Sequence, residues 1–356
     1  QIQSRGLGDV YKRQEEYELG IAFEHEFEEN DQVLNLDLNY SKYNEYEDNI
    51  FSTQYTQPAF YQSLNHYKIE KGGPLAEFSL EYARSLGDDT ELEMGYVAEF
   101  LEDDITNLSE DFDPDLNTWT LDPNKTNHFI FNQNVHAFYT TLGHNIGNFS
   151  FLAGLRSEQT FITSNLISNA EEIENDYFKI YTTLHLGFEI NDEQELQLSY
   201  IKRIKRADSD EHNPFPEYKD PRNREAGNPK LKPEQVHSLE LGYQWQNEKF
   251  SFIPTLYYRY MYDAFAEIQE VVQDTILHST YTNLESESSA GLELILTSNY
   301  FENLGITLSS NIFYQVFDAS NIGFSNKRSN ISWNAKLAAL WNINKSSYIQ
   351  TNAYYR

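Results

Sequence analysis

Carboxylates at alternate positions make residues 111–117 the stretch whose spacing most resembles a metal-binding loop. Asp111, Asp113 and Asp115 are followed by Asn117, which matches the oxygen ligands in the first half of a calcium-binding loop. The glycine at the sixth position and the distal glutamate that complete such loops are missing. The pattern predicts a solvated acidic loop, with a structural calcium ion held by these four residues as the alternative.

Basic side chains are unusually dense between positions 202 and 232 of an otherwise acidic chain. Acidic residues nearly balance them within the same stretch, so we expect them to form internal ion pairs. The alternative is a local positive patch that steers an anionic ligand. The basic residues are Lys202, Arg203, Lys205, Arg206, Lys219, Arg222, Arg224, Lys230 and Lys232.

The sequence contains no recognisable catalytic constellation. Its nine histidines are scattered, without the spacing of a zinc site on a helix, and cysteine is absent. It has neither a Ser–His–Asp set at a shared strand end nor a glycine-rich phosphate loop. We therefore expect no enzyme activity, no catalytic residue and no bound cofactor.

The connections between strand-like segments alternate strictly between very short and long ones. An antiparallel sheet with its tight turns at one end and its long loops at the other has the layout of an outer-membrane β-barrel. A soluble sandwich mixes its loop lengths between the two ends. The short connections are Asn30-Asp31, residues 87–90, 144–148 and 191–194, Asn247-Glu248, residues 299–305 and Asn344-Lys345.

Apolar and polar side chains alternate along these segments with the period of two expected of strands that have one face on lipid. In residues 331–343, Trp333, Leu337 and Trp341 share a face opposite Asn334 and Lys336. We expect about fourteen strands of roughly 9–15 residues each, long enough to cross a bilayer at a tilt. The predicted fold class is all-β, an antiparallel transmembrane outer-membrane β-barrel of which this chain holds part. The alternative is a large soluble β-sandwich.

Aromatic residues and one histidine give further expectations about the two faces. Tyr257, Tyr258, Tyr260 and Tyr262 cluster at the long-loop end of one segment, where an interfacial girdle belongs. His185 is expected on the lumen side. A girdle at this height would mark the edge of the lipid band.

The overall composition excludes several classes of protein. A net charge of -30 argues against nucleic-acid binding. The mean hydropathy is -0.65, and the chain has no apolar run as long as a membrane-spanning helix needs. The acidic groups are therefore expected in loops that face water.

Residues 196–243 carry motifs that name a family. The segment resembles the C-terminal barrel of TonB-dependent receptors, specifically the outer-membrane β-barrel family common in Bacteroidetes-type bacteria, and residues 15–356 fit this resemblance. One departure is Ala207, where that family usually has proline. The matching loop residues are Asn213, Pro214, Phe215, Gly227, Asn228, Pro229, Leu231, Lys232, Pro233 and Glu234.

The same motif has a physical interpretation. Pro229 and Pro233 fix their own φ angles and bias Asn228 and Lys232 toward extended backbone, and Gly227 permits a turn that is closed to other residues. We expect this segment to lead a long loop rigidly back into the next strand. Direct contact with a ligand is the alternative.

The resemblance implies an outer-membrane location in a Gram-negative cell and a role as the barrel of a receptor that imports a bulky nutrient, such as a ferric chelate, a cofactor or an oligomer. It also implies lipid around the barrel, an N-terminal plug domain and the TonB machinery as partners. A passive pore, or a structural or adhesive barrel, is the alternative from another class, and a barrel enzyme is the third. The sequence identifies no substrate.

Both ends of the chain are predicted to be cut. Residues 1–14 resemble a translated adapter sequence and carry Arg5, Lys12 and Arg13 without strand periodicity. We expect residues 1–14 to be a non-native leader and residues 15–356 to be a barrel domain truncated at both ends.

Overall fold

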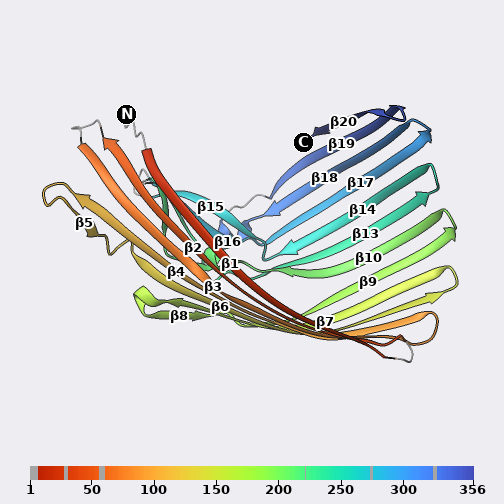
Figure 1. The fold of residues 1–356 in the computed structure, drawn as a ribbon, viewed down its shortest axis with the longest axis horizontal. Coiled ribbons are helices and arrows are strands. Elements are labelled where there is room, and N and C mark those ends of the chain that lie inside the picture. Colours follow the sequence, from red (N-terminus) through yellow and green to blue (C-terminus); the bar gives the residue numbers. More distant parts are fainter. Residues whose placement is uncertain (1–6, 28–30, 56–60, 221, 273–275, 324–326) are drawn as a thin grey trace.

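One large antiparallel sheet, which we call the wall sheet, forms most of the computed structural model, which describes residues 7–27, 31–55, 61–220, 222–272, 276–323 and 327–356. Fourteen of its sixteen strands follow one another in chain order, and β5 (Thr118–Leu121) and β8 (Glu171–Glu174) pair at the side. It curves into an open trough (Figure 1). The fourteen strands are β1 (Leu7–Glu26), β2 (Val33–Tyr55), β3 (Tyr61–Ser85), β4 (Thr90–Asp113), β6 (Asn127–Ile146), β7 (Phe149–Leu166), β9 (Tyr177–Asn191), β10 (Gln194–Lys205), β13 (Glu234–Gln246), β14 (Phe250–Tyr262), β17 (Ser286–Phe301), β18 (Leu304–Asp318), β19 (Arg328–Asn344) and β20 (Ser347–Tyr355).

The predicted alternation of short and long connections holds from β3 onward, but at the loop end only residues 56–60 join β2 to β3. Tight turns join β3 to β4, β6 to β7, β9 to β10, β13 to β14, β17 to β18 and β19 to β20, and they lie together at one end of the trough (Figure 1). We call this the turn end and the opposite one the loop end. The turn predicted at Asn30-Asp31 falls partly outside the described residues.

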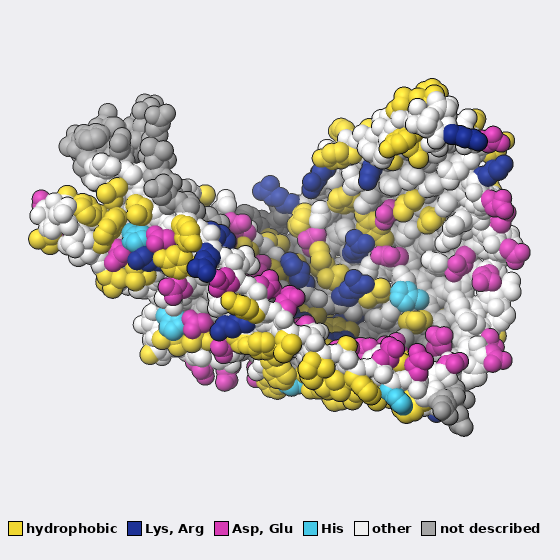
Figure 2. All heavy atoms as spheres, viewed as in Figure 1, with side chains coloured by type: hydrophobic (Ala, Val, Ile, Leu, Met, Phe, Trp, Pro, Cys, Tyr) yellow, Lys and Arg dark blue, Asp and Glu magenta, His cyan; other side chains and the backbone are white. Residues whose placement is uncertain are grey.

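The two faces of the wall sheet differ as the period of two predicts. Cross-strand partners carry an apolar row over six neighbouring strands on the convex outer face, and every member of the row is exposed. Figure 2 shows hydrophobic side chains gathered along the outer side of the wall. Such a band fits the hydrocarbon core of a bilayer. The row consists of Leu198, Leu241, Leu256, Leu292, Ile312 and Trp333.

The predicted tyrosine girdle is only partly right. Tyr258 and Tyr260 are exposed, whereas Tyr257 is only 8% exposed and donates a hydrogen bond to Asn311 Oδ1 over 3.2 Å. Neighbouring residues of a strand point to opposite faces, so Tyr257 lies on the inner face, opposite Tyr258. The adjacent Gly291 leaves room for its ring, since a Cβ there would lie 2.6 Å from it.

Three strands are much longer than predicted. β2, β3 and β4 have 23, 25 and 24 residues, whereas about 9–11 residues suffice for a tilted crossing. β2 and β3 stay paired without interruption from Val33↔Ala83 to Tyr55↔Tyr61. These strands therefore continue beyond the apolar band at the loop end. The expected length was wrong because the alternation of apolar and polar residues does not show where the lipid-facing part of a strand ends.

Two long loops fold together into a second sheet of four strands, which we call the cap sheet. β11 (Glu217–Asp220) and β12 (Asn223–Ala226) come from the loop after β10, and β15 (Phe265–Val272) and β16 (Ile276–Asn283) come from the loop after β14. The order is β11-β12-β16-β15, and the pairing between the two loops, β12 with β16, is parallel. Ala207, Leu231 and Phe265 form its buried core with Tyr281 packed against them.

A second hydrophobic core joins the wall to the loop after β10. Ile105, Phe129, Phe131, Ile162 and Leu166 are almost fully buried on β4, β6 and β7, and Phe215 of that loop packs against them. The loop carries the one-turn helix α1 (Ser209–His212), and short 3-10 turns lie at η1 (Ile167–Asn169) and η2 (Ser320–Ile322). The loop thus covers the inner face at the loop end.

The two outermost strands have one partner each within the described ranges: β1 pairs with β2 and β20 with β19. Residues 7–14 continue β1 against β2. Their assignment to a non-native leader, and the truncation of the barrel, stay predictions. No helix in the described part of the chain is long and apolar enough to cross a membrane.

Candidate functional site

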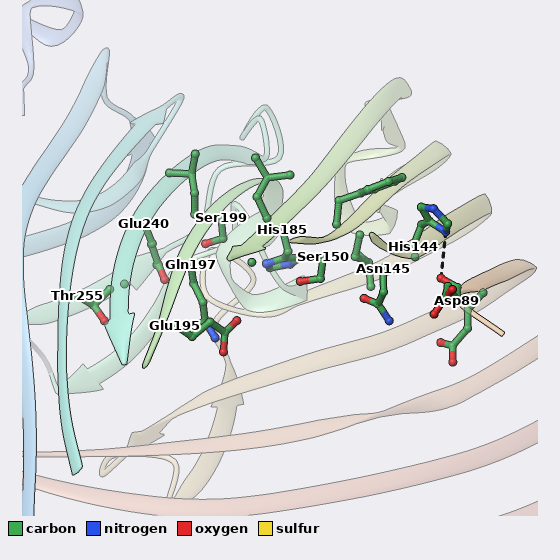
Figure 3. Close-up of a pocket in the computed structure, with 18 of the residues that line it drawn as sticks. Asp89, His144, Asn145, Ser150, His185, Glu195, Gln197, Ser199, Glu240 and Thr255 are labelled. Atoms are coloured by element: carbon green, nitrogen blue, oxygen red, sulfur yellow. Dashed lines mark hydrogen bonds between the residues drawn. The ribbon is translucent and has the colours of Figure 1, made fainter. Parts of the chain in front are cut away.

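The inner face of the trough holds a hollow of about 590 Å³ near the turn end. Figure 3 shows the side chains of His185, Glu195, Gln197, Ser199 and Glu240 around it, carried by β9, β10 and β13. His185 lies on the inner face, as predicted from its place in the alternation. The hollow therefore belongs mainly to the wall strands, and the turn between β3 and β4 contributes Asp88 and Asp89 to its lining.

Strand register explains why a hollow forms at this place. Cross-strand pairing aligns Ser150, Gly187, Gln197, Gly242 and Thr255 in one row over five strands. Two members of the row are glycines, which have no side chain to fill the space. A Cβ at Gly187 would lie 2.4 Å from the Ser150 Oγ, so a larger residue at this position would collide with the serine that lines the hollow.

Carboxylates dominate the charge of the hollow. Asp88, Asp89, Glu91, Glu195 and Glu240 line it, and no lysine or arginine is among the residues that do. Clefts lined by charge of one sign focus the electrostatic potential. The turn end of the inner face is therefore suited to a cationic or hydrogen-bond-donating surface.

Basic groups gather further toward the loop end of the same face. Glu158, only 3% exposed, accepts hydrogen bonds from Arg156 over 3.0 Å and from Arg206. Arg206 also donates to the Tyr177 hydroxyl over 3.1 Å. Arg203 lines the neighbouring part of the wall beside Tyr181. Arg206 thus forms an ion pair, but the carboxylate that it uses lies on β7, so the prediction that it pairs within its own stretch is wrong.

The hollow lacks a paired nucleophile and base among the described residues. His185 stands beside Ser199 and Ser150 in Figure 3, yet no hydrogen bond joins it to either serine. Activation of a serine requires a base within hydrogen-bond reach. The arrangement supports binding and steering of a guest. Leu239 and Glu240 are neighbours on β13 and so point to opposite faces of the sheet. Only the strand register shows that Glu240 shares a hollow with residues of other strands.

The family motif begins at a short, well-capped turn. Asp208 caps α1 by accepting hydrogen bonds from the backbone amides of Asp210 and Glu211, and the Glu211 carboxylate accepts one from the Asp208 amide. Asn213 ends the turn, and its Oδ1 accepts from the Phe215 backbone over 3.1 Å. Pro214 lies between them. This geometry turns the chain inward, so that Phe215 reaches the core on the wall.

His212, on the same turn, is buried against the wall. It is 1% exposed, and its ring stacks on Phe131 with centroids 5.1 Å apart. Burial lowers the pKa of His212 to about 4, although a hydrogen bond to the Pro229 backbone acts in the opposite direction. The imidazole is therefore neutral at neutral pH.

Gly227 meets the turn so closely that it excludes other residues. A Cβ there would lie 2.3 Å from the Glu211 backbone oxygen and 2.5 Å from that of Asp210. Its amide donates to the Asn213 oxygen over 2.6 Å, and the Asn228 amide donates to the Glu211 oxygen over 2.6 Å. The two ends of the motif are therefore fastened to each other.

The second half of the motif ties the cap sheet to the wall. Leu231 is 1% exposed in the core of the cap sheet, and its backbone oxygen accepts from Asn175 over 2.7 Å. Lys232 exchanges two backbone hydrogen bonds with the Asn283 side chain. Glu234, after the buried Pro233, accepts from the Phe265 amide over 3.0 Å. These contacts are those of a structural anchor.

Residues 111–117 comprise the end of β4 and the hairpin turn that leads into β5. Asp113 accepts hydrogen bonds from the backbone amides of Asp115 and Leu116, and Asp111 accepts from Asn65 over 2.6 Å. Asn117 takes a positive φ of 50°, as such turns often require. No group of three or more candidate ligands occurs within the described ranges. The geometry favours a turn, and calcium at this loop stays a prediction.

A family model of outer membrane protein beta-barrels matches residues 25–356. Solved structures similar to the chain include the copper transporter OprC (TM-score 0.54, 11% identity), the siderophore receptor PiuA from Acinetobacter baumannii (0.54, 12%) and the ferric yersiniabactin uptake receptor FyuA from Yersinia pestis (0.52, 13%). The likenesses cover 96%, 96% and 90% of this chain and 65%, 60% and 50% of those proteins, respectively. At these identities they concern the fold alone. No match to the sequence was found among curated proteins.

Proposed function

Because the chain belongs to the outer membrane protein beta-barrel family, and so to the outer membrane, we propose that it forms the barrel wall of a TonB-dependent receptor that imports a bulky nutrient. Ferric chelates, cofactors and oligomers are the candidate substrate classes. The family match and the shared fold support this proposal. The chain spans roughly half to two thirds of the length of the similar structures. Transport, the plug domain and the coupling to TonB are therefore part of the proposal.

The observation that carries the proposal is the cap sheet. A passive pore needs an open mouth, whereas here two long loops pair through β12 and β16 and share a buried core that contains Leu231, while Phe215 of the loop after β10 packs against the core on the wall. A mouth covered by a folded structure suits a receptor that captures its ligand first. The carboxylate-lined hollow would then face a plug domain below the cap.

The test is uptake by cells that carry the full-length gene. Ferric citrate, a ferric hydroxamate and a copper chelate serve as labelled probes, in cells with and without a functional TonB complex. The proposal predicts uptake of at least one probe that disappears without TonB. Uptake of small solutes that persists without TonB would instead support a passive pore.

A further inference from the structure

A small cavity lies at the loop end, between the long extensions of β2–β4 and the cap sheet. Its volume is about 190 Å³. β2, β3, β4, the segment before β6 and β11 all contribute to its lining, so it exists only when the loop after β10 is docked. Its main side chains are Asn49, Phe51, Tyr67, Asn107, Lys125 and Tyr218.

Three aromatic side chains form one side of this cavity, which we call the ring cavity. Tyr218 of the cap sheet stacks on Tyr67 of the wall, with centroids 6.2 Å apart and planes 19° from parallel. Phe51 meets Tyr67 edge-on at 5.7 Å. Aromatic faces bind flat rings and the apolar faces of ring compounds well. The aromatic side therefore selects for a ring.

Polar atoms without partners form another side. The Oδ1 atoms of Asn49 and Asn107 have no hydrogen-bond partner in the described part of the structure, and Asn49 is 9% exposed. A buried acceptor left unpaired costs about 1–3 kcal/mol. Both oxygens can accept hydrogen bonds from hydroxyl groups of a guest.

Charged residues also line the cavity, namely Lys68, Glu217 and Lys125. The ammonium of Lys125 lies 5.6 Å from the centre of the Tyr218 ring and is held by Asp122 at 2.8 Å. It can donate to a hydroxyl or ether oxygen. The ring cavity thus offers a stacking face, two acceptors and a donor.

We propose that the ring cavity binds one hydroxylated six-membered ring. A cavity of about 150 Å³ holds one benzene molecule, so the space suits a single ring with its hydroxyl groups and excludes drug-sized guests, which need about 300 Å³ or more. A sugar and a dihydric phenol share this chemistry. The inference stands apart from transport, because capture at the loop end does not require that the guest be moved.

The motif loop is what builds this site. Phe215 fastens the loop to the wall core, and Pro216 and Tyr218, just beyond it, enter the lining. The family motif therefore positions one wall of a binding site without touching the guest through Asn213 or Gly227.

The experiment uses the purified full-length protein in detergent. Methyl glucoside, methyl galactoside, methyl mannoside and catechol are tested separately by saturation-transfer NMR and titration calorimetry. The proposal expects saturable binding of at least one probe. Binding of a glycoside identifies a sugar site, and binding of catechol identifies a phenol site. Absence of saturable binding by all four overturns the proposal.

Two variants and one control locate the binding. Tyr218→Ala removes the stacking ring and Asn49→Ala removes an acceptor, and each should weaken binding by roughly tenfold or more. Tyr300→Ala, at an exposed tyrosine of the turn end (72% exposed), should leave binding unchanged. Heat-modified migration of each variant checks that it folds. Equal affinity of folded Tyr218→Ala and the parent protein would contradict the assignment.

Discussion

Asn228 Nδ2 donates a hydrogen bond to the backbone oxygen of Tyr281 over 3.1 Å, and the two residues belong to different long loops. Asn283, two residues after Tyr281, likewise donates from its Nδ2 to the backbone oxygens of Lys232 and Asp263. The parallel pairing of β12 with β16 runs beside these contacts. The two loops therefore form one folded unit, and disturbing the motif in one should release the other.

Substitution of Gly227 by alanine should detach the cap sheet. The new Cβ would meet two backbone oxygens within 2.5 Å, and backbone cannot move aside as a flexible side chain can. Limited proteolysis of the full-length protein should cut the loop after β10 markedly faster. Gly242→Ala is the matched control, since its Cβ would meet nothing nearer than 3.7 Å. Equal cleavage of the two variants would contradict the anchoring role.

Acidification should weaken docking of the loop that carries His212. Its folded pKa, lowered by burial to about 4, lies below the ordinary value of 6.5. The unfolded or undocked state therefore binds more protons between these values. Above pH 6.5 the imidazole is neutral in both states and docking has its full stability. As the pH falls below 6.5, the docked state becomes less stable, and the total loss below pH 4 is about 3 kcal/mol. Hydrogen exchange of the loop between pH 7 and pH 4 measures this.

His212→Phe provides the control for this pH dependence. It keeps a ring that can stack on Phe131 but cannot bind a proton. Glu211, whose pKa is raised by burial, contributes in the opposite direction in both proteins, so the difference between them isolates the histidine. Identical pH profiles for the variant and the parent would show that His212 does not control docking.

Removal of the Glu158 carboxylate should destabilise the inner wall. Glu158→Gln leaves the charges of Arg156 and Arg206 without their shared carboxylate. Charged hydrogen bonds contribute about 1.5–3 kcal/mol, and partial exposure of both arginines makes the lower part of that range the expected cost. Reversible unfolding in detergent measures it. Glu172→Gln, at an exposed residue of β8, should cost almost nothing, and an equal loss in both would refute the role.

Arginine on the outer face of β14 should be far more costly than arginine next to it on the inner face. Leu256 lies in the apolar row, and Thr255 lines the hollow. Leu256→Arg should lower the free energy of unfolding by roughly 2–4 kcal/mol near the bilayer midplane, whereas Thr255→Arg should lower it much less. Urea unfolding in lipid vesicles compares the two. Equal costs would contradict the assignment of Leu256 to lipid and Thr255 to the inner face.

The wall sheet could be predicted because the alternation of apolar and polar residues lies within each strand. Trp333 and Leu337 alternate with Asn334 and Lys336, and no distant residue is needed to assign their faces. The prediction that Tyr257, Tyr258, Tyr260 and Tyr262 form one girdle is wrong for Tyr257, because closeness along the chain does not place residues on the same face of a strand. Tyr257 follows the period of two and lies inside.

Long-range pairing could not be predicted in the same way. The sequence marks Gly227 and Pro229 as special, but it does not indicate that Asn228 contacts Tyr281, because the partner lies in another loop. The hollow depends equally on register, which places Gly187 and Gly242 in one row. Arg206 was expected to pair within its loop, and only the docked loop brings it to Glu158.

The orientation of the wall sheet in the outer membrane is tested most directly by labelling single cysteines. The chain has no cysteine, so Asp113→Cys at the loop end and Asp192→Cys at the turn end can be introduced separately into the full-length protein. The account predicts that an impermeant maleimide labels Asp113→Cys on intact cells and labels Asp192→Cys only after the cells are opened. Labelling of Asp192→Cys, and not of Asp113→Cys, on intact cells would contradict it.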